Sequence, residues 1–409
     1  MIASRRRPAI IIGVVVLAVV LPGIFVARKA AGLGRLGTPV HETTTDAPPP
    51  GPLRGTDGWA VKADGRLTDV AILPNRGEVI YVEEVAPRVW RATAVDAQTG
   101  AVRWRNSRGH TAHIEAWAVT DAAVVLAYHH SASRLAWRTH HAVSFEGLDP
   151  VSGKVLWTRH IYNLLGERPG DYAPTLASPS ENVVYARTEF GVPNAVDTMT
   201  GETLWEHPGL GGCRSDEIVA GPAGVAVSQR CPDGKERIEL LSPRTGNAVW
   251  KTEISTPNLR LLAVGTNSVA VYQGGLVQQV IVLGPGGGYA ATVPCDCGDG
   301  AGLSGGPAGA ALLVGGPIGL VAADGATGKV MWQKKVEGGP VHRVLAQDGD
   351  AFVVSGDGGL LRVDPPTGAT QRVVPGGAGK LDPSAVVAAV GGYIAAGSGT
   401  GFGFSGPAR

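Results

Sequence analysis

Charge is scarce in this chain of 409 residues: Asp, Glu, Lys and Arg make up 17% of it, with 36 basic and 35 acidic residues. The lack of a basic stripe, or of basic residues interleaved with aromatics, argues against a nucleic-acid partner. Four cysteines are too few to staple a small domain, and a chain of this length buries a core without them. Long amphipathic helical patterns are also missing after the N-terminus. Glycine (60 residues) and proline (29) are plentiful, and this composition predicts an all-β chain of short strands and tight turns.

One long run carries no charge. It covers 19 residues, Ala9 to Ala27, and follows three arginines at positions 5–7. As a helix it reaches about 28 Å, enough to span a bilayer core. The alternative is a cleaved signal peptide, whose apolar region is normally shorter and followed by small residues. Here a basic pair follows at 28–29, so we predict an uncleaved transmembrane helix over residues 9–27.

The segments on either side of this helix predict its orientation in the membrane. Basic residues lie on both sides of it, so the positive-inside bias is slight. The cysteines and the length of the following domain favour a cytoplasmic stub at residues 1–8 and an extracytoplasmic bulk. Residues 28–56 include three threonines in a row and Pro48–Pro50, which predicts a semi-extended linker. The folded domain is then expected over residues 57–409.

A repeated motif organises that domain. AVDAQTGAVRW ends at Trp104 and returns as GLDPVSGKVLW, AVDTMTGETLW, LLSPRTGNAVW and AADGATGKVMW. A sixth copy, RVDPPTGATQR, has Arg372 in place of tryptophan, and VLGPGGGYAAT keeps only Gly288 in register. The turn glycines are Gly100, Gly153, Gly201, Gly246, Gly288, Gly328 and Gly368, spaced 53, 48, 45, 42, 40 and 40 residues apart. That period suits four short strands with their turns, one blade of a β-propeller.

Each residue type in the motif has a physical role. Glycine at the end of the turn can adopt positive φ, as a short hairpin loop with a bulge requires. Aspartate or serine four residues earlier can accept hydrogen bonds from the turn's own amides. The tryptophan begins the next strand, where its ring can bury a large apolar area between neighbouring blades.

This pattern resembles the repeat of the pyrroloquinoline-quinone (PQQ)-like β-propeller family, over about residues 57–405. The resemblance implies that tryptophan is a structural docking residue between blades, which here applies to Trp104, Trp157, Trp205, Trp250 and Trp332. The family's enzymes are dehydrogenases that use PQQ and Ca²⁺ and carry two adjacent cysteines over the quinone. This chain has no Cys-Cys dipeptide and no Asp, Glu and Asn set that maps onto their calcium and base positions. No catalytic, cofactor-binding or metal residue is therefore carried over.

The resemblance favours a non-catalytic module over an enzyme. The family also includes an outer-membrane assembly scaffold lipoprotein that lacks PQQ, but this chain has no lipidation cysteine after its apolar run, the first cysteine being Cys213. We expect a membrane-anchored propeller that binds a protein or a cell-envelope ligand, with no cofactor. The alternative is a PQQ-dependent oxidoreductase. The composition, rich in Gly, Ala, Val and Arg, is typical of a GC-rich bacterium.

The number of blades depends on how the ring closes. Three strands are predicted near residues 386–390, 393–396 and 401–404, and residues 57–61 form an isolated strand that contains Trp59. If that strand completes the C-terminal blade, both chain ends close the ring and the propeller has eight blades. Seven is the alternative.

Cysteines and histidines are the remaining candidate site residues. Cys213, Cys231, Cys295 and Cys297 match a zinc site poorly, because one pair is spaced C-x-C, so we expect disulfides. Six histidines fall within 32 residues: His110, His113, His129, His130, His140 and His141. Adjacent members point to opposite faces of a strand, so the metal candidates reduce to His110, His113, His129 and His140, although ordinary surface positions are favoured. Trp117, Tyr128 and Trp137 are expected in the core rather than in an exposed aromatic site.

Overall fold

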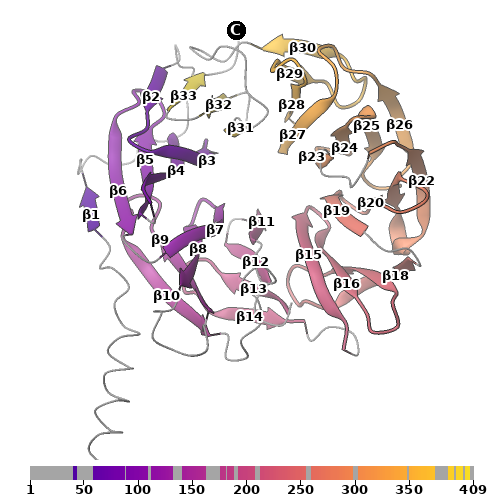
Figure 1. Ribbon diagram of the computed structural model, residues 1–409, viewed down its shortest axis with the longest axis horizontal. Helices are drawn as coiled ribbons and strands as arrows, with labels where there is room; N and C mark the ends of the chain where they lie inside the picture. Colours follow the sequence, from indigo (N-terminus) through magenta and orange to yellow (C-terminus); the bar gives the residue numbers. More distant parts are fainter. Residues whose placement is uncertain are drawn as a thin grey trace, which may run out of the picture.

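The structure is a computed structural model, and the elements of its described residues are β-strands and one short 3₁₀ turn, η3 (Pro285–Gly287). Figure 1 shows the strands arranged in small sheets that follow one another around a ring in sequence order. The predicted all-β architecture of four-stranded antiparallel sheets is confirmed. The residues that the structure describes are 40–43, 59–87, 89–108, 112–131, 141–162, 176–180, 182–187, 192–207, 212–254, 259–297, 303–347, 350–373, 386–390, 393–398 and 401–405.

The described strands form eight sheets, numbered here in chain order. Sheet 1 contains β3 (Arg66–Leu73), β4 (Glu78–Ala86), β5 (Val89–Asp96) and β6 (Val102–Arg108), and sheet 2 contains β7 (Ala112–Val119), β8 (Val124–Ser131), β9 (His141–Leu148) and β10 (Val155–Tyr162). Sheet 3 contains β11 (Leu176–Ser180), β12 (Val183–Arg187), β13 (Pro193–Asp197) and β14 (Thr203–Glu206), and sheet 4 contains β15 (Arg214–Gly221), β16 (Gly224–Arg230), β17 (Glu236–Leu241) and β18 (Ala248–Ile254). Sheet 5 contains β19 (Leu259–Val264), β20 (Val269–Gln273), β21 (Gln279–Leu283) and β22 (Tyr289–Pro294). Sheet 6 contains β23 (Ser304–Ala308), β24 (Ala311–Gly316), β25 (Gly319–Asp324) and β26 (Val330–Lys334), and sheet 7 contains β27 (Val341–Gln347), β28 (Asp350–Ser355), β29 (Leu360–Val363) and β30 (Thr370–Val373).

Sheet 8 joins the two ends of the domain. It contains β31 (Val386–Val390), β32 (Tyr393–Ser398), β33 (Gly401–Ser405) and, on its outer edge, β2 (Trp59–Lys62). Trp59 lies opposite Phe404 in the register, and their rings stack with centroids 5.0 Å apart. The predicted pairing of the isolated N-terminal strand with the C-terminal strands is therefore confirmed. It joins residues far apart in sequence without a covalent turn.

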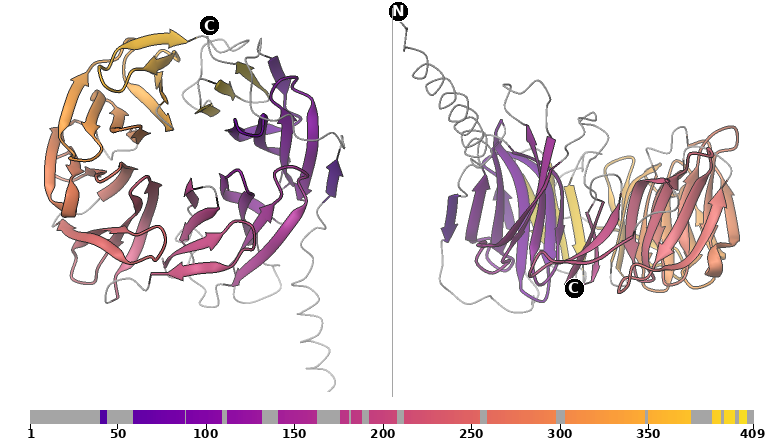
Figure 2. Two further views of the ribbon diagram at one scale, coloured as in Figure 1. Left: turned by 180° about the vertical axis from the view of Figure 1, so that it is seen from behind. Right: turned by 90° about the horizontal axis from the view of Figure 1, so that it is seen from below.

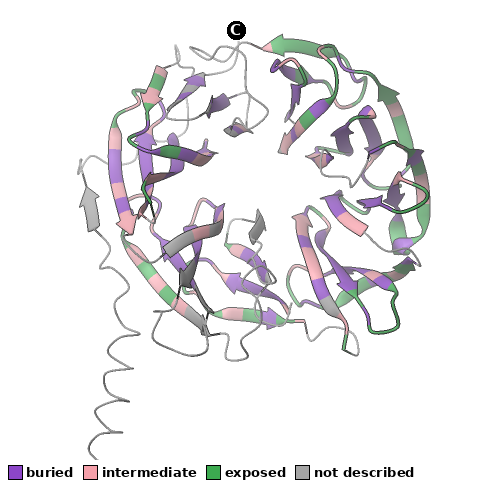
Figure 3. Cartoon of the chain, in the orientation of Figure 1, coloured by how far each residue is buried: buried purple, intermediate pink, exposed green. Residues whose placement is uncertain are grey.

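Within each sheet the first strand lies nearest the ring axis and the fourth lies on the rim (Figure 1). Figure 3 shows that exposure is concentrated on the outer strands, such as β26 and β30, whereas the second and third strands are mostly buried. The core is thus divided among the interfaces between neighbouring sheets.

An additional strand, β1 (Val40–Thr43), lies within the segment that we predicted to be a linker. It pairs antiparallel with β6 as a fifth strand of sheet 1, with Val40 opposite Ser107 and Thr43 opposite Trp104. The outer strand of a sheet offers unpaired N–H and C=O groups along one edge, which an extended segment can satisfy. The extended conformation was anticipated, but the pairing was not.

None of the helices in the described part of the chain is long and apolar enough to cross a membrane. The predicted transmembrane segment, residues 9–27, lies outside the described residues.

The repeated turns have the predicted geometry. The Asp96 carboxylate accepts hydrogen bonds from the amides of Gln98 and Thr99, at 2.8 and 2.9 Å. Gly100 closes the turn with φ of 72°. The turns at Asp197 and Asp324 repeat this arrangement.

Tryptophan connects most of these turns to the preceding sheet. The Trp104 ring packs so closely over Gly153 of sheet 2 that a Cβ atom on this glycine would lie 2.5 Å from it. Trp104 Nε1 donates to Pro150 O in the same turn at 2.7 Å. The same pair of contacts joins Trp59 to the turn of sheet 1, Trp157 to sheet 3, Trp205 to sheet 4 and Trp332 to sheet 7. We call this contact the tryptophan lock.

The lock between sheets 4 and 5 is incomplete, and it corrects one assignment. The turn at the start of β22 is one residue shorter than the others, with Gly284 N bonded to Gly288 O. Gly287, not Gly288, therefore adopts positive φ and faces the Trp250 ring. Trp250 Nε1 has no hydrogen-bond partner among the described residues, because the shortened turn does not bring a carbonyl to it.

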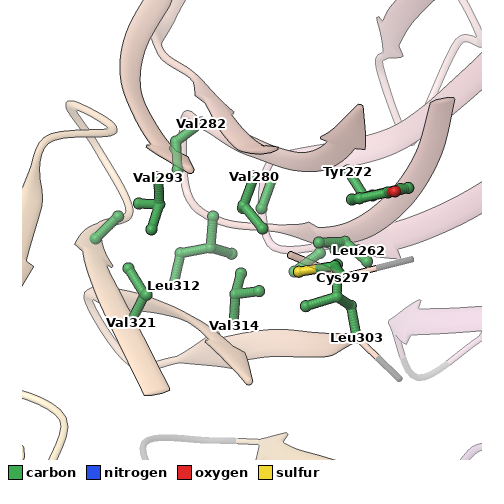
Figure 4. Packing of buried hydrophobic residues seen from close by; sticks show 13 residues of the cluster. Leu262, Tyr272, Val280, Val282, Val293, Cys297, Leu303, Leu312, Val314 and Val321 are labelled. Carbon is green, nitrogen blue, oxygen red and sulfur yellow. The ribbon is translucent and has the colours of Figure 1, made fainter. Parts of the chain in front are cut away.

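Two interfaces lack tryptophan for different reasons. Between sheets 5 and 6, Ala290 lies against Gly328, and aliphatic side chains fill the interface (Figure 4): Val280, Val282, Val293, Leu312, Val314 and Val321. Between sheets 7 and 8 the position belongs to Arg372, which bonds Asp357 of its own sheet at 2.8 Å. Sheet 8 has no covalent turn between β33 and β2, so no turn glycine is present there for a tryptophan to cover.

A second contact, which we did not predict, lies two residues after the tryptophan. Asn106 Nδ2 donates to Gly153 O at 2.8 Å, and Lys334 Nζ donates to Thr367 O at 2.7 Å. His207 does the same in sheet 3, with Nδ1 3.0 Å from Gly246 O and Nε2 2.6 Å from the buried Glu239 carboxylate. A polar residue at this position is the sequence signal for the contact.

The tryptophan lock predicts the effect of adding one methyl group. Gly153→Ala combines left-handed strain, about 1–2 kcal/mol, with overpacking against Trp104, about 1–3 kcal/mol. Gly234 also has positive φ (77°) but no atom within 4 Å of its would-be Cβ, so Gly234→Ala should show the strain alone. Chemical denaturation of both variants measures the difference, and equal losses of stability would contradict the lock.

His207 predicts a pH dependence of stability. The hydrogen bond to Glu239 raises the pKa of His207, because the protonated ring can donate to both acceptors. A raised folded-state pKa gives stability that is fully present below the unfolded value, about 6.5, and lost as pH rises through the folded value. We expect His207→Asn, which copies Asn106, to cost most stability below about pH 6.5 and progressively less at higher pH. Melting curves from pH 5 to 9 test this, and a difference independent of pH would contradict it.

Candidate binding face

The topology gives the ring two unlike faces. The turn face carries the turns between first and second strands and between third and fourth strands. The variable face carries the hairpins between second and third strands and the connections from one sheet to the next. In the side view of Figure 2 the strands run across the ring from one face to the other.

The turn face is occupied by contacts that hold the ring together. Most of its turn glycines are covered by tryptophan, and neighbouring turns bond directly to each other. Ala223 N donates to Gly265 O at 3.0 Å, and Asn267 N donates to Gly325 O at 2.8 Å. A face on which one turn type recurs between the third and fourth strands offers less chemical variety for recognising a ligand.

Both disulfides lie on the variable face. Cys213, in the connection before β15, pairs with Cys231 at the end of β16. Cys295 pairs with Cys297 in the connection between β22 and β23. All four cysteines of the chain are therefore placed in disulfides, which leaves none for the zinc site weighed above.

Charged residues surround the first disulfide. Arg237 Nη1 lies 3.2 and 3.0 Å from the two sulfur atoms, and its Nε donates to Glu253 at 2.9 Å. Lys235 donates to the same carboxylate at 2.8 Å. Hydrogen bonds from Lys235 and then Arg237 lower the pKa of Glu253. This side of sheet 4 therefore presents charged side chains that are held in place by hydrogen bonds to one another.

The neighbouring hairpin presents the opposite chemistry. Leu276 is fully exposed and Val277 is 62% exposed, at the tip between β20 and β21. The base of this hairpin is held firmly, because Gln278 O accepts from Cys295 N and Gln278 Oε1 accepts from Cys297 N, each at 2.9 Å. We call residues 274–278 the apolar hairpin.

A second apolar feature lies on the rim. The residue before the tryptophan is exposed on several outer strands: Leu156, Leu204, Val249 and Met331. These side chains are spread over four sheets, so they form a series of single exposed residues rather than one patch.

Several buried carboxylates serve the fold. Glu83 accepts from Arg91 and from Gly65 N, both at 2.8 Å. Glu78, on the turn side of sheet 1, lies 3.5 Å from Arg76 and 3.1 Å from Arg103. Burial raises its pKa to about 7, against the opposing effect of the two guanidinium groups. No nucleophile or second acid accompanies it within hydrogen-bond distance among the described residues, so we assign Glu78 no catalytic role.

The predicted histidine candidates are only partly placed. His110 and His140 lie outside the described residues. The backbone register puts His113 of β7 opposite His129 of β8 and puts His141 opposite Ser131. The described residues contain no group of three or more His, Cys, Asp or Glu that could hold a metal ion. A histidine metal site therefore stays a prediction.

PQQ enzymes of the family hold a calcium ion beside the quinone. This calcium needs several oxygen ligands in one place, whereas the buried carboxylates Glu83 and Glu78 face arginine side chains or a backbone amide. No calcium ligand set is identified among the described residues, so no chemical step is derived through PQQ and its absence stays a prediction.

Of the aromatic residues of β7 and β8, Tyr128 is buried as expected. Trp117 is partly buried, and its Nε1 donates to Asp69 of sheet 1 at 2.6 Å. Trp137 lies outside the described residues. Trp117 thus links two inner strands and is not part of an exposed aromatic site.

Sequence comparison identifies the family. The profile described as outer membrane protein assembly factor BamB (PQQ_2) matches residues 142–299 and 234–404, together more than half of the chain. The chain belongs to this family. Membership confirms the PQQ-like propeller resemblance. No curated protein sequence matches the chain significantly.

Solved structures agree on the fold. The computationally designed Ika8 protein has a TM-score of 0.54 at 14% identity, covering 86% of this chain and 98% of that one. The Dos1 propeller also has a TM-score of 0.54, at 10% identity, covering 86% and 95%. BamB from Moraxella catarrhalis is 16% identical, with a TM-score of 0.49 and coverage of 78% and 96%. At these identities the first two show the propeller fold alone.

Proposed function

We propose that this protein is a membrane-anchored, extracytoplasmic, eight-bladed propeller that binds a protein or cell-envelope ligand on its variable face without catalysing a reaction. The observation that carries the proposal is the division between the faces. The turn face uses its groups to join sheets, whereas the variable face carries both disulfides, the charged cluster of sheet 4 and the apolar hairpin. Loops supported by a rigid scaffold are suited to recognition.

The residue found at each interface between consecutive sheets supports a count of eight blades. Six tryptophans and two substituted positions correspond to the eight interfaces between consecutive sheets. Inner-strand contacts between β3 and β31 join the last sheet to the first.

The kind of ligand is inferred from the family and from the surface chemistry. The family's description refers to assembly of outer membrane proteins, which suits a scaffold that holds a protein partner. Anchoring is inferred from the uncharged run at residues 9–27. An anchored propeller would hold its partner close to the bilayer.

Crosslinking in native membranes tests the binding face. A photoreactive residue in place of Lys235 on the variable face should give a discrete adduct of higher mass. The same residue in place of Gln98, which is exposed on the turn face, is the matched control and should give none. Adducts from Gln98 alone, or equal adducts from both positions, would place binding elsewhere.

Titration with PQQ and Ca²⁺ tests the non-catalytic part of the proposal. We expect no saturable change in tryptophan fluorescence and no rise in melting temperature at cofactor concentrations of about 10 μM. Saturable binding with a Kd near or below about 1 μM would support the oxidoreductase alternative and call for a screen of alcohols and sugars.

A further inference from the structure

The path of β1 determines the side of the ring on which the N-terminal segment enters. β6 begins at the turn face, after Gly100, and ends at Arg108 on the variable face. Because β1 is antiparallel to it, with Val40 opposite Ser107 and Thr43 opposite Trp104, the chain enters β1 at the variable face and leaves it at the turn face. Whatever precedes Val40 therefore reaches the ring from the variable side.

The length of the preceding segment limits the distance to a membrane. If the predicted span ends at Ala27, twelve residues (28–39) lie between it and Val40. Fully extended, they reach about 40 Å. To turn the other face toward the bilayer, they would first have to pass the thickness of sheet 1, roughly 23 Å for the seven residues of β6. The short segment therefore favours a variable face that looks toward the membrane.

The apolar hairpin lies on the same face and on the far side of the ring. Figure 1 shows β20 and β22 across the ring from β1 and β6. Leu276 and Val277 extend from a base that Gln278 ties to the Cys295–Cys297 connection. Two exposed aliphatic side chains on a braced tip are suited to the boundary between lipid headgroups and acyl chains, where apolar groups bury about 5–10 Å deep.

We infer that the apolar hairpin inserts Leu276 and Val277 into the lipid surface, so that the propeller lies with its variable face toward the bilayer. The inference rests on the proposed anchor. The ring is then held at two opposite points, by β1 at sheet 1 and by the hairpin at sheet 5. A ligand of the variable face must be bound in the gap between the ring and the bilayer.

A single fluorescent probe on the full chain tests the inference. All four native cysteines are in disulfides, so Leu276→Cys creates a free thiol for an environment-sensitive dye. The matched control is Asn267→Cys, exposed in the same sheet but on the turn face. Both are reconstituted in phosphatidylcholine vesicles that contain a headgroup-level spin-labelled lipid. Zwitterionic lipid avoids repulsion of Asp296, which is exposed near the hairpin.

The expected result is quenching at position 276 that exceeds that at 267 by at least about two-fold, as the interfacial depth implies. Val277→Asp in the Leu276→Cys background should abolish this excess while the protein stays attached, since the anchor is unchanged. Equal quenching at the two positions, or greater quenching at 267, would overturn the inference. Excess quenching only in native membranes would also overturn it, because the hairpin would then contact a membrane protein.

Attachment itself is scored separately. Flotation of the vesicles after an alkaline wash reports whether residues 9–27 hold the chain in the bilayer. Loss of flotation would reject the proposed anchor whatever the probes show. Retained flotation without excess quenching at 276 would reject only the orientation.

Discussion

The fold depends on the packing of an indole ring over a glycine that has no side chain. At Gly153 the space for a Cβ atom is already taken by Trp104, and the indole N–H is bonded in the same turn. Neither partner is effective alone, because the ring needs the flat glycine surface and the turn needs positive φ. Repeated in full at five of the eight junctions between consecutive sheets, this contact holds most neighbours of the ring in the same geometry. It also explains why the motif is strictest on the turn face and why diversity is tolerated on the other.

Much of this architecture could be predicted, because the residues that determine it are close together in sequence. Asp96, Gly100 and Trp104 lie within nine positions, so their spacing shows the turn and the following strand directly. The pairing of the strand that contains Trp59 with the strand that contains Phe404 could also be predicted, because an isolated N-terminal strand can complete a C-terminal blade that lacks its fourth strand. The register of Gly287 was not, because four glycines among five residues allow several alignments and only the shortened turn selects one.

The candidate face was harder to infer, because it depends on residues brought together from distant hairpins. Nothing in the sequence links Gln278 with both Cys295 and Cys297, yet these bonds brace the tip that exposes Leu276. Similarly, Val40–Thr43 has no periodicity that distinguishes it from its polar surroundings, and only the free edge of β6 gives it a partner. The residue two positions after Trp104, Trp205 and Trp332 is Asn, His and Lys respectively, so the contact that these three residues share cannot be seen from residue type.

The pairing of β1 with β6 has a mechanical consequence. A pull on the chain ahead of Val40 along the axis of β1 loads the hydrogen bonds of the β1–β6 ladder in shear, so that they share the force. The seam between β2 and β33, which closes the ring without a covalent link, lies beyond β1 along the chain and bears no force while that ladder holds. The four residues of β1 thus protect the β2–β33 pairing, so that a force applied at the N-terminal end does not open the ring.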